Sequence, residues 1–450
     1  MLVGAWLAGT LGCKTFVDST LQTRTALDVN ALDDALSASN AALGVKRADQ
    51  TPAPLKRNDA LLLLDRAMVL QALADYPASS RDFEVADKAI EILDFSRSTA
   101  HEISRYLFSD SAGPYKARPY EKLLLNSLNM INYLVRQDLD GAKVEARRFT
   151  VMRDYLLREE GGGRQELGGA DAPGGYLAGY TFEQAGDPEE ALRYYDEALQ
   201  SENFSSLAEP VKRLMRRSGY RTPRLEASAR SIGGPSPSPE QSGDCELTIL
   251  VNYGRVPAMV AKRVPIGVAL AISAIFLPPG AEQQARRLAG QGLVTWVNYP
   301  ELAPAKARYT PPVVTVDGAA RQFEMVANVD AIVQASWDES KGRVIAAAIV
   351  RMLARAAIGA GVGVATGKAS DRSSLGVLAA IIAQGAMVAA DKPDTRSWAT
   401  LPARISLVRT RLPPGPHRVE INVSGRSYVR NVTLAPAQWM VLNITDLSTS

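Results

Sequence analysis

The segment GAGVGVATGKA at residues 359–369 has the composition of a phosphate-binding loop. A Walker A loop needs G-x-x-x-x-G-K-[ST], because its backbone amides surround the phosphates and its terminal hydroxyl binds magnesium. Counting back from Gly367 and Lys368, the first glycine is replaced by Val362, and the hydroxyl residue is replaced by Ala369. The residues before the loop have helical periodicity, whereas a Walker A loop follows a strand. The sequence therefore argues against a nucleotide site here.

Histidines and cysteines are too scarce to form an obvious catalytic or metal site. The chain has two histidines, His101 and His417, which lie more than 300 residues apart. No G-x-S-x-G or S-x-x-K motif occurs, and no pair of cysteines or histidines has ligand spacing. We therefore predict no enzymatic activity, no cofactor and no metal. The net charge of +3 over 450 residues is too small to indicate a nucleic-acid partner.

The loop at residues 394–402, DTRSWATLP, is the most distinctive candidate for ligand binding. Arg396 could form a bidentate hydrogen bond with a sugar or peptide, and Trp398 could stack on it. The alternative has Trp398 buried where a helix meets the C-terminal sheet, with Arg396 paired to Asp394. The sequence favours this alternative.

Lipid attachment is indicated at the amino terminus. Residues 2–11 form a mostly apolar run that has the length of a signal-peptide core and is too short to span a bilayer. Gly12 and Cys13 follow it directly, as in a bacterial lipoprotein signal, so residues 1–13 are expected to be a signal segment and Cys13 a lipidated anchor. The pattern departs from the usual one because Thr10 replaces a leucine and no basic residue precedes the run. The alternative is an ordinary cysteine in an N-terminal helix.

The elements that would position a binding surface are clearest at residues 176–199, which have the spacing of a tetratricopeptide hairpin of two helices. Asp187 is expected to cap the second helix, and Pro188 suits its first position. Such a hairpin needs neighbours to cover its apolar face, and stacked hairpins usually form a binding groove. The residues expected to pack this hairpin are Gly179, Phe182, Gly186, Ala191, Tyr195 and Ala198.

Two weaker hairpins are predicted at residues 61–93 and 120–149. Their equivalent small residues, Ser79 and Ala142, are spaced irregularly from Ala191, which indicates degenerate repeats with insertions. The glycine-rich residues 161–175 are expected to form a loop between repeats.

The domain organisation predicted from composition has four parts, and the fold class is α+β. Residues 1–13 are the signal segment, 18–217 a helical tetratricopeptide-like domain, 218–244 a Pro/Gly/Ser-rich linker, and 245–450 a mixed α+β domain. Residues 405–445 are expected to form four short strands, in an antiparallel meander or small sandwich. Asp317 and Gly318 predict a hairpin turn between strands. Cys245 is expected to be a small packing residue.

The apolar helices expected within residues 343–390 leave three possibilities open. Gly359, Gly363 and Gly367 repeat every four residues, a spacing that lets two helices approach closely. The helices are expected to pack in a soluble core or an oligomer interface, with membrane insertion as the alternative. The apolar residues 264–277 are too short to span a membrane and are expected to be buried in the core.

On four sets of residues, the chain resembles an uncharacterised family of tetratricopeptide-containing bacterial outer-membrane lipoproteins. The resemblance spans most of the mature chain and implies an envelope location and a scaffolding role, without catalytic residues. It rests on residues 115–149 (notably 119–121 and 144–148), on 243–247, and most strongly on 394–398 with 401–403.

The leading functional hypothesis is therefore a non-enzymatic lipoprotein that is anchored to the outer membrane through Cys13 and faces the periplasm. Its helical repeats would bind a protein partner, in envelope assembly or in the control of peptidoglycan synthesis. One alternative is a glycan- or ligand-binding module centred on the C-terminal domain. Another is a homo-oligomeric, membrane-associated ring component.

Overall fold

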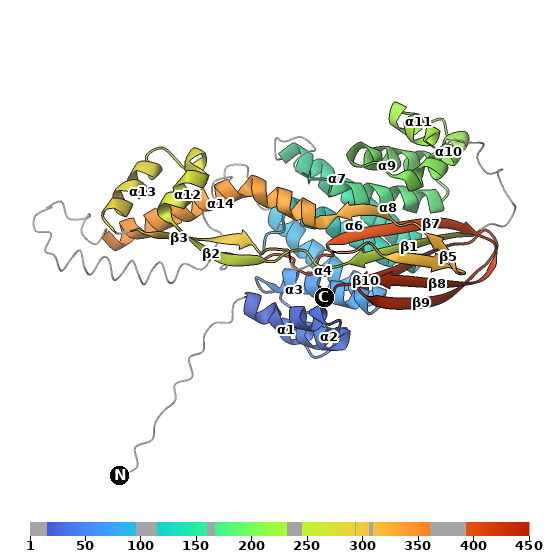
Figure 1. Cartoon of the computed structure of the whole chain (residues 1–450), viewed down its shortest axis with the longest axis horizontal. Coiled ribbons are helices and arrows are strands. Elements are labelled where there is room, and N and C mark those ends of the chain that lie inside the picture. Colours follow the sequence, from blue (N-terminus) through green and yellow to red (C-terminus); the bar gives the residue numbers. More distant parts are fainter. Residues whose placement is uncertain are drawn as a thin grey trace, which may run out of the picture.

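The computed structural model describes residues 16–95, 115–159, 167–231, 245–292, 294–305, 309–360 and 393–449 (Figure 1). The predicted lipidation site Cys13 and residues 361–390 of the apolar segment lie outside this described part. The first half of the described chain is helical, and the second half combines β-sheets with further helices. The fold is therefore of the α+β class, as the sequence predicts.

The N-terminal half is a stack of helical hairpins. The pairs are α1 (Phe16–Asp28) with α2 (Leu32–Leu43), α3 (Asp59–Ala72) with α4 (Tyr76–Phe95), α6 (Pro119–Val135) with α7 (Leu139–Glu159), and α8 (Asp171–Gln184) with α9 (Pro188–Ser201). Each hairpin packs against the next. After a 3₁₀ turn, η2 (Ser205–Leu207), α10 (Ala208–Arg217) and α11 (Pro223–Arg230) pack on α9.

The four hairpin turns share one backbone geometry. Each contains a residue with positive φ, and the N–H of the following residue bonds to the carbonyl five positions earlier, which is the Schellman arrangement. The positive-φ residues are Asn30 (58°), Ala74 (60°), Gln137 (57°) and Gly186 (77°). In three turns an aspartate comes next and accepts a hydrogen bond from an N–H of the following helix: Asp75, Asp138 and Asp187. The hairpins are thus structural repeats, although only one turn uses glycine.

The C-terminal half is built on a sandwich of two four-stranded sheets. One sheet has the order β10-β1-β7-β6 and the other β5-β4-β8-β9, and only the β1–β10 pairing is parallel. Apolar side chains from both sheets form a shared core. The strands are β1 (Cys245–Tyr253), β4 (Val313–Val316), β5 (Ala319–Arg321), β6 (Glu324–Asn328), β7 (Arg404–Leu412), β8 (Gly415–Val423), β9 (Arg426–Leu434) and β10 (Trp439–Asp446).

The four strands expected at residues 405–445 are present, and they divide between the two sheets of the sandwich, so the sandwich alternative holds and the meander does not. The first and last, β7 and β10, flank β1, whereas β8 and β9 join β4. The predicted turn at Asp317 and Gly318 is confirmed, with φ values of 52° and 78° between β4 and β5. The strand after this turn is short because the chain crosses at residues 322–323 to the other sheet, where β6 pairs with β7.

The helical stack covers the outer face of the sheet that contains β1 (Figure 1). Helices α3 and α6 lie on β10, and α8 contacts β6. The hydrophobic core therefore runs without a break from the hairpins into the C-terminal half.

A smaller part of the C-terminal half projects from one end of the molecule, at the left in Figure 1, and is called the lobe here. It consists of the two-stranded sheet β2 (Met259–Pro265) and β3 (Trp296–Leu302), α12 (Ile266–Ser273), η3 (Ala274–Phe276), α13 (Ala281–Gly290) and α14 (Val329–Ala360). Helix α12 packs on α14. On α14, residues 345–349 are buried, with Ala348 and Ile349 completely so, and this part of the predicted 343–390 segment packs inside the protein.

The expected linker at residues 218–244 contains a short helix, α11, at Pro223–Arg230. Thr222 caps α11 by accepting a hydrogen bond from the N–H of Leu225, and the Leu225 side chain is fully buried. Pro223 takes the first helical position, which proline favours. Residues 232–244 lie outside the described part.

Candidate functional site

The hairpin of α8 and α9 is held by a close approach between a glycine and a tyrosine. A Cβ atom added to Gly179 would lie 2.4 Å from the Tyr195 ring, so only glycine fits there. Ala191 and Ala198 are buried on the facing side of α9. Phe182 stacks on Tyr194, with ring centroids 5.3 Å apart. Five of the six residues singled out in the sequence thus lie in these two helices, whereas Gly186 lies in the turn between them, where a Cβ would meet nothing within 4 Å.

The same pairing of glycine with an aromatic ring recurs in neighbouring contacts of the stack. Gly141 of α7 lies under the Tyr133 ring of α6, and Gly174 of α8 lies under the Phe149 ring of α7. Gly174 belongs to the segment expected to be a loop, yet α8 begins at Asp171. Close packing offsets the entropy lost when such glycines become ordered. The sequence does not reveal that Gly174 is helical, because the ring that packs on it belongs to Phe149 on another helix.

The groove expected on the helical stack is occupied by the chain's own β-sheet. The first helix of each of the last three hairpins (α3, α6 and α8) is buried along nearly its whole length. Polar side chains of β1 meet these helices: Thr248 donates to the hydroxyl of Tyr180 at 3.2 Å, and Asn252 donates to the side-chain oxygen of Gln71 at 3.2 Å. A partner cannot enter this groove unless the two halves separate.

A buried charge cluster joins the same two halves. The guanidinium of Arg409 on β7 binds Glu183 of α8 at 3.1 Å and Glu246 of β1 at 2.7 Å. Burial opposes ionisation of Glu183, but the charges of Arg409 and Arg213 outweigh it and lower its pKa. Burial raises the pKa of Glu246, which has Arg409 as its nearest cation. No local pattern in the sequence around Glu183 indicates that a sheet covers it.

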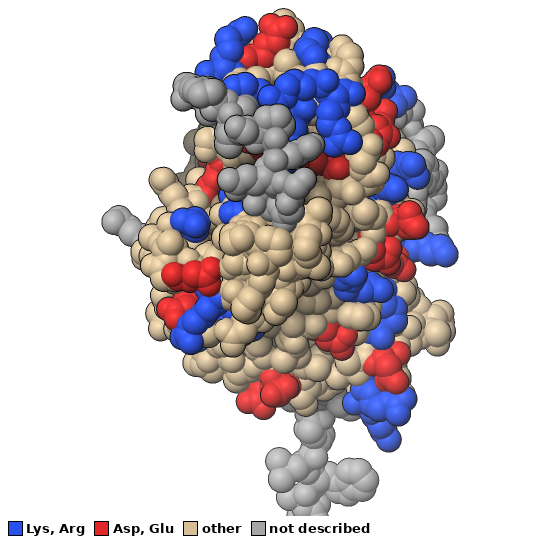
Figure 2. Space-filling model, turned by 90° about the vertical axis from the view of Figure 1, so that its right-hand side faces the viewer, with Lys and Arg blue, Asp and Glu red and all other residues tan. Residues whose placement is uncertain are grey.

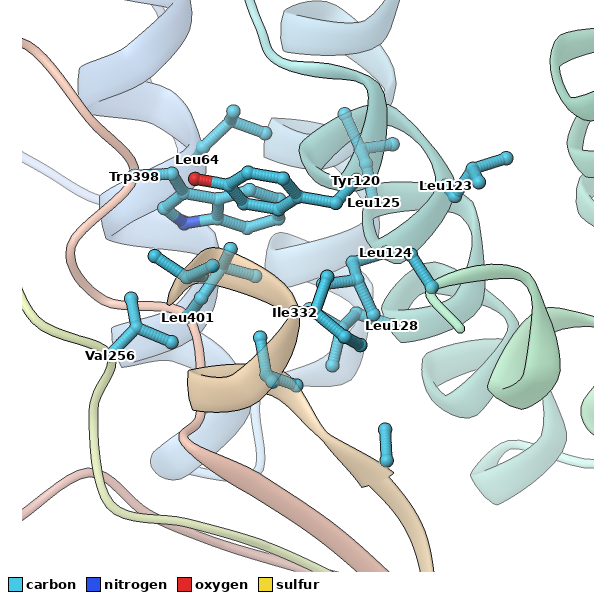
Figure 3. Close-up of a cluster of buried hydrophobic side chains, with 14 of the residues drawn as sticks. Leu64, Tyr120, Leu123, Leu124, Leu125, Leu128, Val256, Ile332, Trp398 and Leu401 are labelled. Atoms are coloured by element: carbon cyan, nitrogen blue, oxygen red, sulfur yellow. The ribbon is translucent and has the colours of Figure 1, made fainter. Parts of the chain in front are cut away.

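The 394–402 loop is packed against the helices and presents neither of its candidate ligand contacts. Arg396 binds both carboxylate oxygens of Asp394, at 2.8 and 2.6 Å. The Trp398 side chain is 1% exposed, and Figure 3 shows its ring among apolar side chains of α3, α6 and the loop. Its backbone N–H donates to Glu121 of α6 at 3.0 Å. The loop therefore has the buried arrangement that the sequence favours.

A hydrogen-bonded chain links the Trp398 indole to a buried carboxyl group. The indole N–H donates to the Thr400 hydroxyl at 3.0 Å, and that hydroxyl donates to Asp65 of α3 at 2.7 Å. Burial raises the pKa of Asp65 from 3.8 to about 7, despite the hydrogen bond from Thr400. This arrangement suits a structural role, because Asp65, Thr400 and Trp398 are all buried.

Helix α7 turns a face to solvent that combines apolar and basic residues. The side chains of Val144 and Val151 are 45% and 65% exposed, and Arg147 and Arg148 are exposed beside them. Beneath this face, burial raises the pKa of Glu145 to about 7, although Arg148 binds it at 3.0 Å. This face lies on the second helix of its hairpin, which the sheet leaves open.

At the end of the molecule that is at the right of Figure 1, several basic residues gather at the top, in the region of α10 and α11, and others are scattered among acidic residues over the rest of this face (Figure 2). Several of these arginines have acidic partners: Arg213 binds Glu183, and Arg224 binds Asp196. Their charge is therefore partly neutralised, which does not favour a polyanionic ligand at this end.

Within the described residues, no group of three or more histidine, cysteine, aspartate or glutamate side chains could hold a metal ion. Cys245 is buried at the start of β1. None of the helices in the described ranges has both the length and the apolarity to cross a membrane. Comparisons with protein-family models, curated proteins and solved structures found no match.

Proposed function

We propose that this protein is a non-enzymatic scaffold of the bacterial cell envelope, attached to the outer membrane through a lipid on Cys13 and facing the periplasm. Its partner would be a protein of envelope assembly or of peptidoglycan synthesis. The observation that carries the proposal is the continuous stack of four hairpins fixed to a sandwich by one core. A stack of helical hairpins that is packed on a sandwich offers a rigid surface for binding.

The proposed binding surface is the solvent-exposed face of α7, and not the groove that the sequence predicts. Because the groove holds the chain's own sheet, a partner must use the outer helices. Val144 and Val151 stand seven positions apart on one side of α7 and frame Arg147 and Arg148. An acidic segment with two apolar side chains would complement this face.

The anchor is tested by metabolic labelling with palmitate, comparing the wild type with Cys13→Ser. We expect label in the membrane fraction that disappears in Cys13→Ser. A soluble, unlabelled wild type would remove the lipoprotein part of the proposal.

The binding surface is tested by a pull-down from chemically cross-linked membranes. We expect a reproducible protein partner that is lost when Val144→Glu and Val151→Glu are combined. The matched control is Val29→Glu, whose valine is 69% exposed in the turn between α1 and α2. A partner lost equally in the control, or no partner at all, would refute the assignment of this surface.

A further inference from the structure

The lobe exposes a concentrated apolar surface. Six of the thirteen large hydrophobic side chains that are exposed in the described part lie between Val260 and Trp296, and Ile275 is the most exposed of all at 87%. The six are Val260, Val268, Ile272, Ile275, Phe276 and Trp296. Isolated exposed apolar residues are ordinary, but a cluster of this kind marks an interaction surface.

The centre of this surface is the open side of α12 and η3. Val268, Ile272 and Ile275 follow one another by four and three residues, so they share one side of the helix. The opposite side is buried against α14, with Ala269 and Leu270 at its centre. The sequence predicts burial of this segment, but only one of its sides is covered.

The open side of α12 has no side chain that can form a hydrogen bond outward. From Ile266 to Gly280 the only polar side chain is Ser273, and its hydroxyl is buried and donates to the Ala269 carbonyl at 2.8 Å. Protein interfaces usually carry about one hydrogen bond per 100–200 Å². A surface without donors or acceptors is better matched by the hydrocarbon of a lipid membrane.

The charge around this surface favours an anionic membrane over a second copy of the lobe as its binding partner. Residues 256–302 contain two acidic residues, Glu282 and Glu301, and four basic ones, a net charge of +2. Glu301 pairs with Lys262, and Glu282 pairs with Arg286. The basic residues are Lys262, Arg263, Arg286 and Arg287. A second copy of the lobe would bring like charges together, whereas an anionic membrane would attract them.

An aromatic side chain marks the edge of the apolar surface. Trp296 is 40% exposed, and the Arg263 guanidinium lies 5.2 Å from the centre of its ring. Trp296 pairs across the two-stranded sheet with Pro265, the residue that precedes α12. Tryptophan and arginine side by side are typical of residues that lie at the boundary between headgroups and hydrocarbon.

We propose that the lobe is a membrane-contact surface, which inserts the open side of α12 and η3 into the boundary of an anionic lipid bilayer. The contact is interfacial: α12 lies in the plane of the membrane and does not cross it. It goes beyond the proposed scaffold function and does not depend on lipidation of Cys13.

The test is flotation of the full-length Cys13→Ser chain with vesicles made of equal parts phosphatidylcholine and phosphatidylglycerol. We expect binding that falls on the order of tenfold or more when Val268→Ser and Ile275→Ser are combined. The matched control combines Val29→Ser with Val313→Ser, whose valines are 69% and 56% exposed elsewhere, and should bind like the parent. Since all four residues are exposed, both variants should keep the parent's thermal unfolding curve.

Two further measurements separate electrostatic attraction to lipid headgroups from association with a second copy of the chain. Combining Arg263→Gln with Arg287→Gln should weaken binding to anionic vesicles by roughly fivefold for each charge and leave binding to pure phosphatidylcholine unchanged. Light scattering reports self-association: a dimer lost in the Val268/Ile275 variant would identify a second copy as the occupant and overturn the proposal. Absence of vesicle binding by the parent chain, or equal binding by the lobe variant, would overturn it as well. The vesicles contain no protein, so these outcomes are independent of the partner-binding face of α7.

Discussion

The guanidinium of Arg409 on β7 lies 3.1 Å from both carboxylate oxygens of Glu183 on α8. The two residues are 226 positions apart in the chain, and their side chains are 6% and 4% exposed. Each therefore receives part of its counter-charge from the other half of the protein, in addition to Arg213 beside Glu183 and Glu246 beside Arg409. Substitutions at this contact therefore test whether the sheet stays packed in the groove of the helical stack.

Arg409→Met should destabilise the protein strongly, because it leaves Glu183 and Glu246 buried with less of their counter-charge. We expect a loss of about 3–5 kcal/mol in the free energy of unfolding, measured by urea denaturation. The control is Arg411→Met on the same strand, whose 40%-exposed side chain pairs with Glu209, and it should cost less than about 1 kcal/mol. Similar losses in the two variants would show that the buried cluster contributes little.

The polar face of β1 shows why the closed groove could not be predicted from the sequence. Residues 246–253 alternate like a strand with one solvated face, and the apolar set does point into the sandwich. The polar set, Thr248 and Asn252 among it, instead contacts helices. Their partners Tyr180 and Gln71 lie 68 and 181 positions away, and no local pattern encodes that pairing.

Features set by a few consecutive residues were predictable, because their cause is local. The turn at Gly186, the cap at Asp187 and the Asp317 hairpin turn all follow from the φ values and hydrogen bonds of adjacent residues. The assignment of β7 and β8 to different sheets depends on β1 and β4, which lie far away in the chain. The exposure of α12 depends in the same way on which side α14 covers.

Gly179→Ala should open the contact between α8 and α9. The new Cβ would overlap the Tyr195 ring, and we expect a cost of about 1–3 kcal/mol in urea denaturation from overpacking. Gly219→Ala is the matched control, since a Cβ there meets nothing within 4 Å and its φ is not positive. If both variants unfold at the same urea concentration, the close contact between Gly179 and the Tyr195 ring does not stabilise the pairing of α8 with α9.

Trp398→Ala separates a structural role of the 394–402 loop from a ligand-binding one. Removing a fully packed indole, which also contacts Phe83 with ring centroids 6.0 Å apart, should cost about 3–5 kcal/mol. We expect the melting temperature to fall for Trp398→Ala and for Arg396→Ala, in step with any loss of binding to cell-wall fragments. Loss of such binding at unchanged melting temperature would instead support a glycan site in the C-terminal half.

Asp65→Asn should reduce the dependence of stability on pH. The pKa of Asp65 rises from 3.8 to about 7 on folding, so the folded state binds a proton that the unfolded state releases. Between these two pKa values stability therefore falls as pH rises, and above pH 7 the full penalty of the buried carboxylate remains. Asparagine carries no such charge and can still accept the hydrogen bond from Thr400. The unfolding free energies from urea denaturation at pH 5 and pH 8 should lie closer together in Asp65→Asn than in the wild type, by up to about 3 kcal/mol. Glu145, whose pKa also rises to about 7, should keep part of the pH dependence in the variant.

Asp140→Asn is the control, because its side chain is 99% exposed and the substitution should leave the pH dependence of stability unchanged. An Asp65→Asn slope equal to that of the wild type would mean that Asp65 is ionised in the folded protein throughout this range.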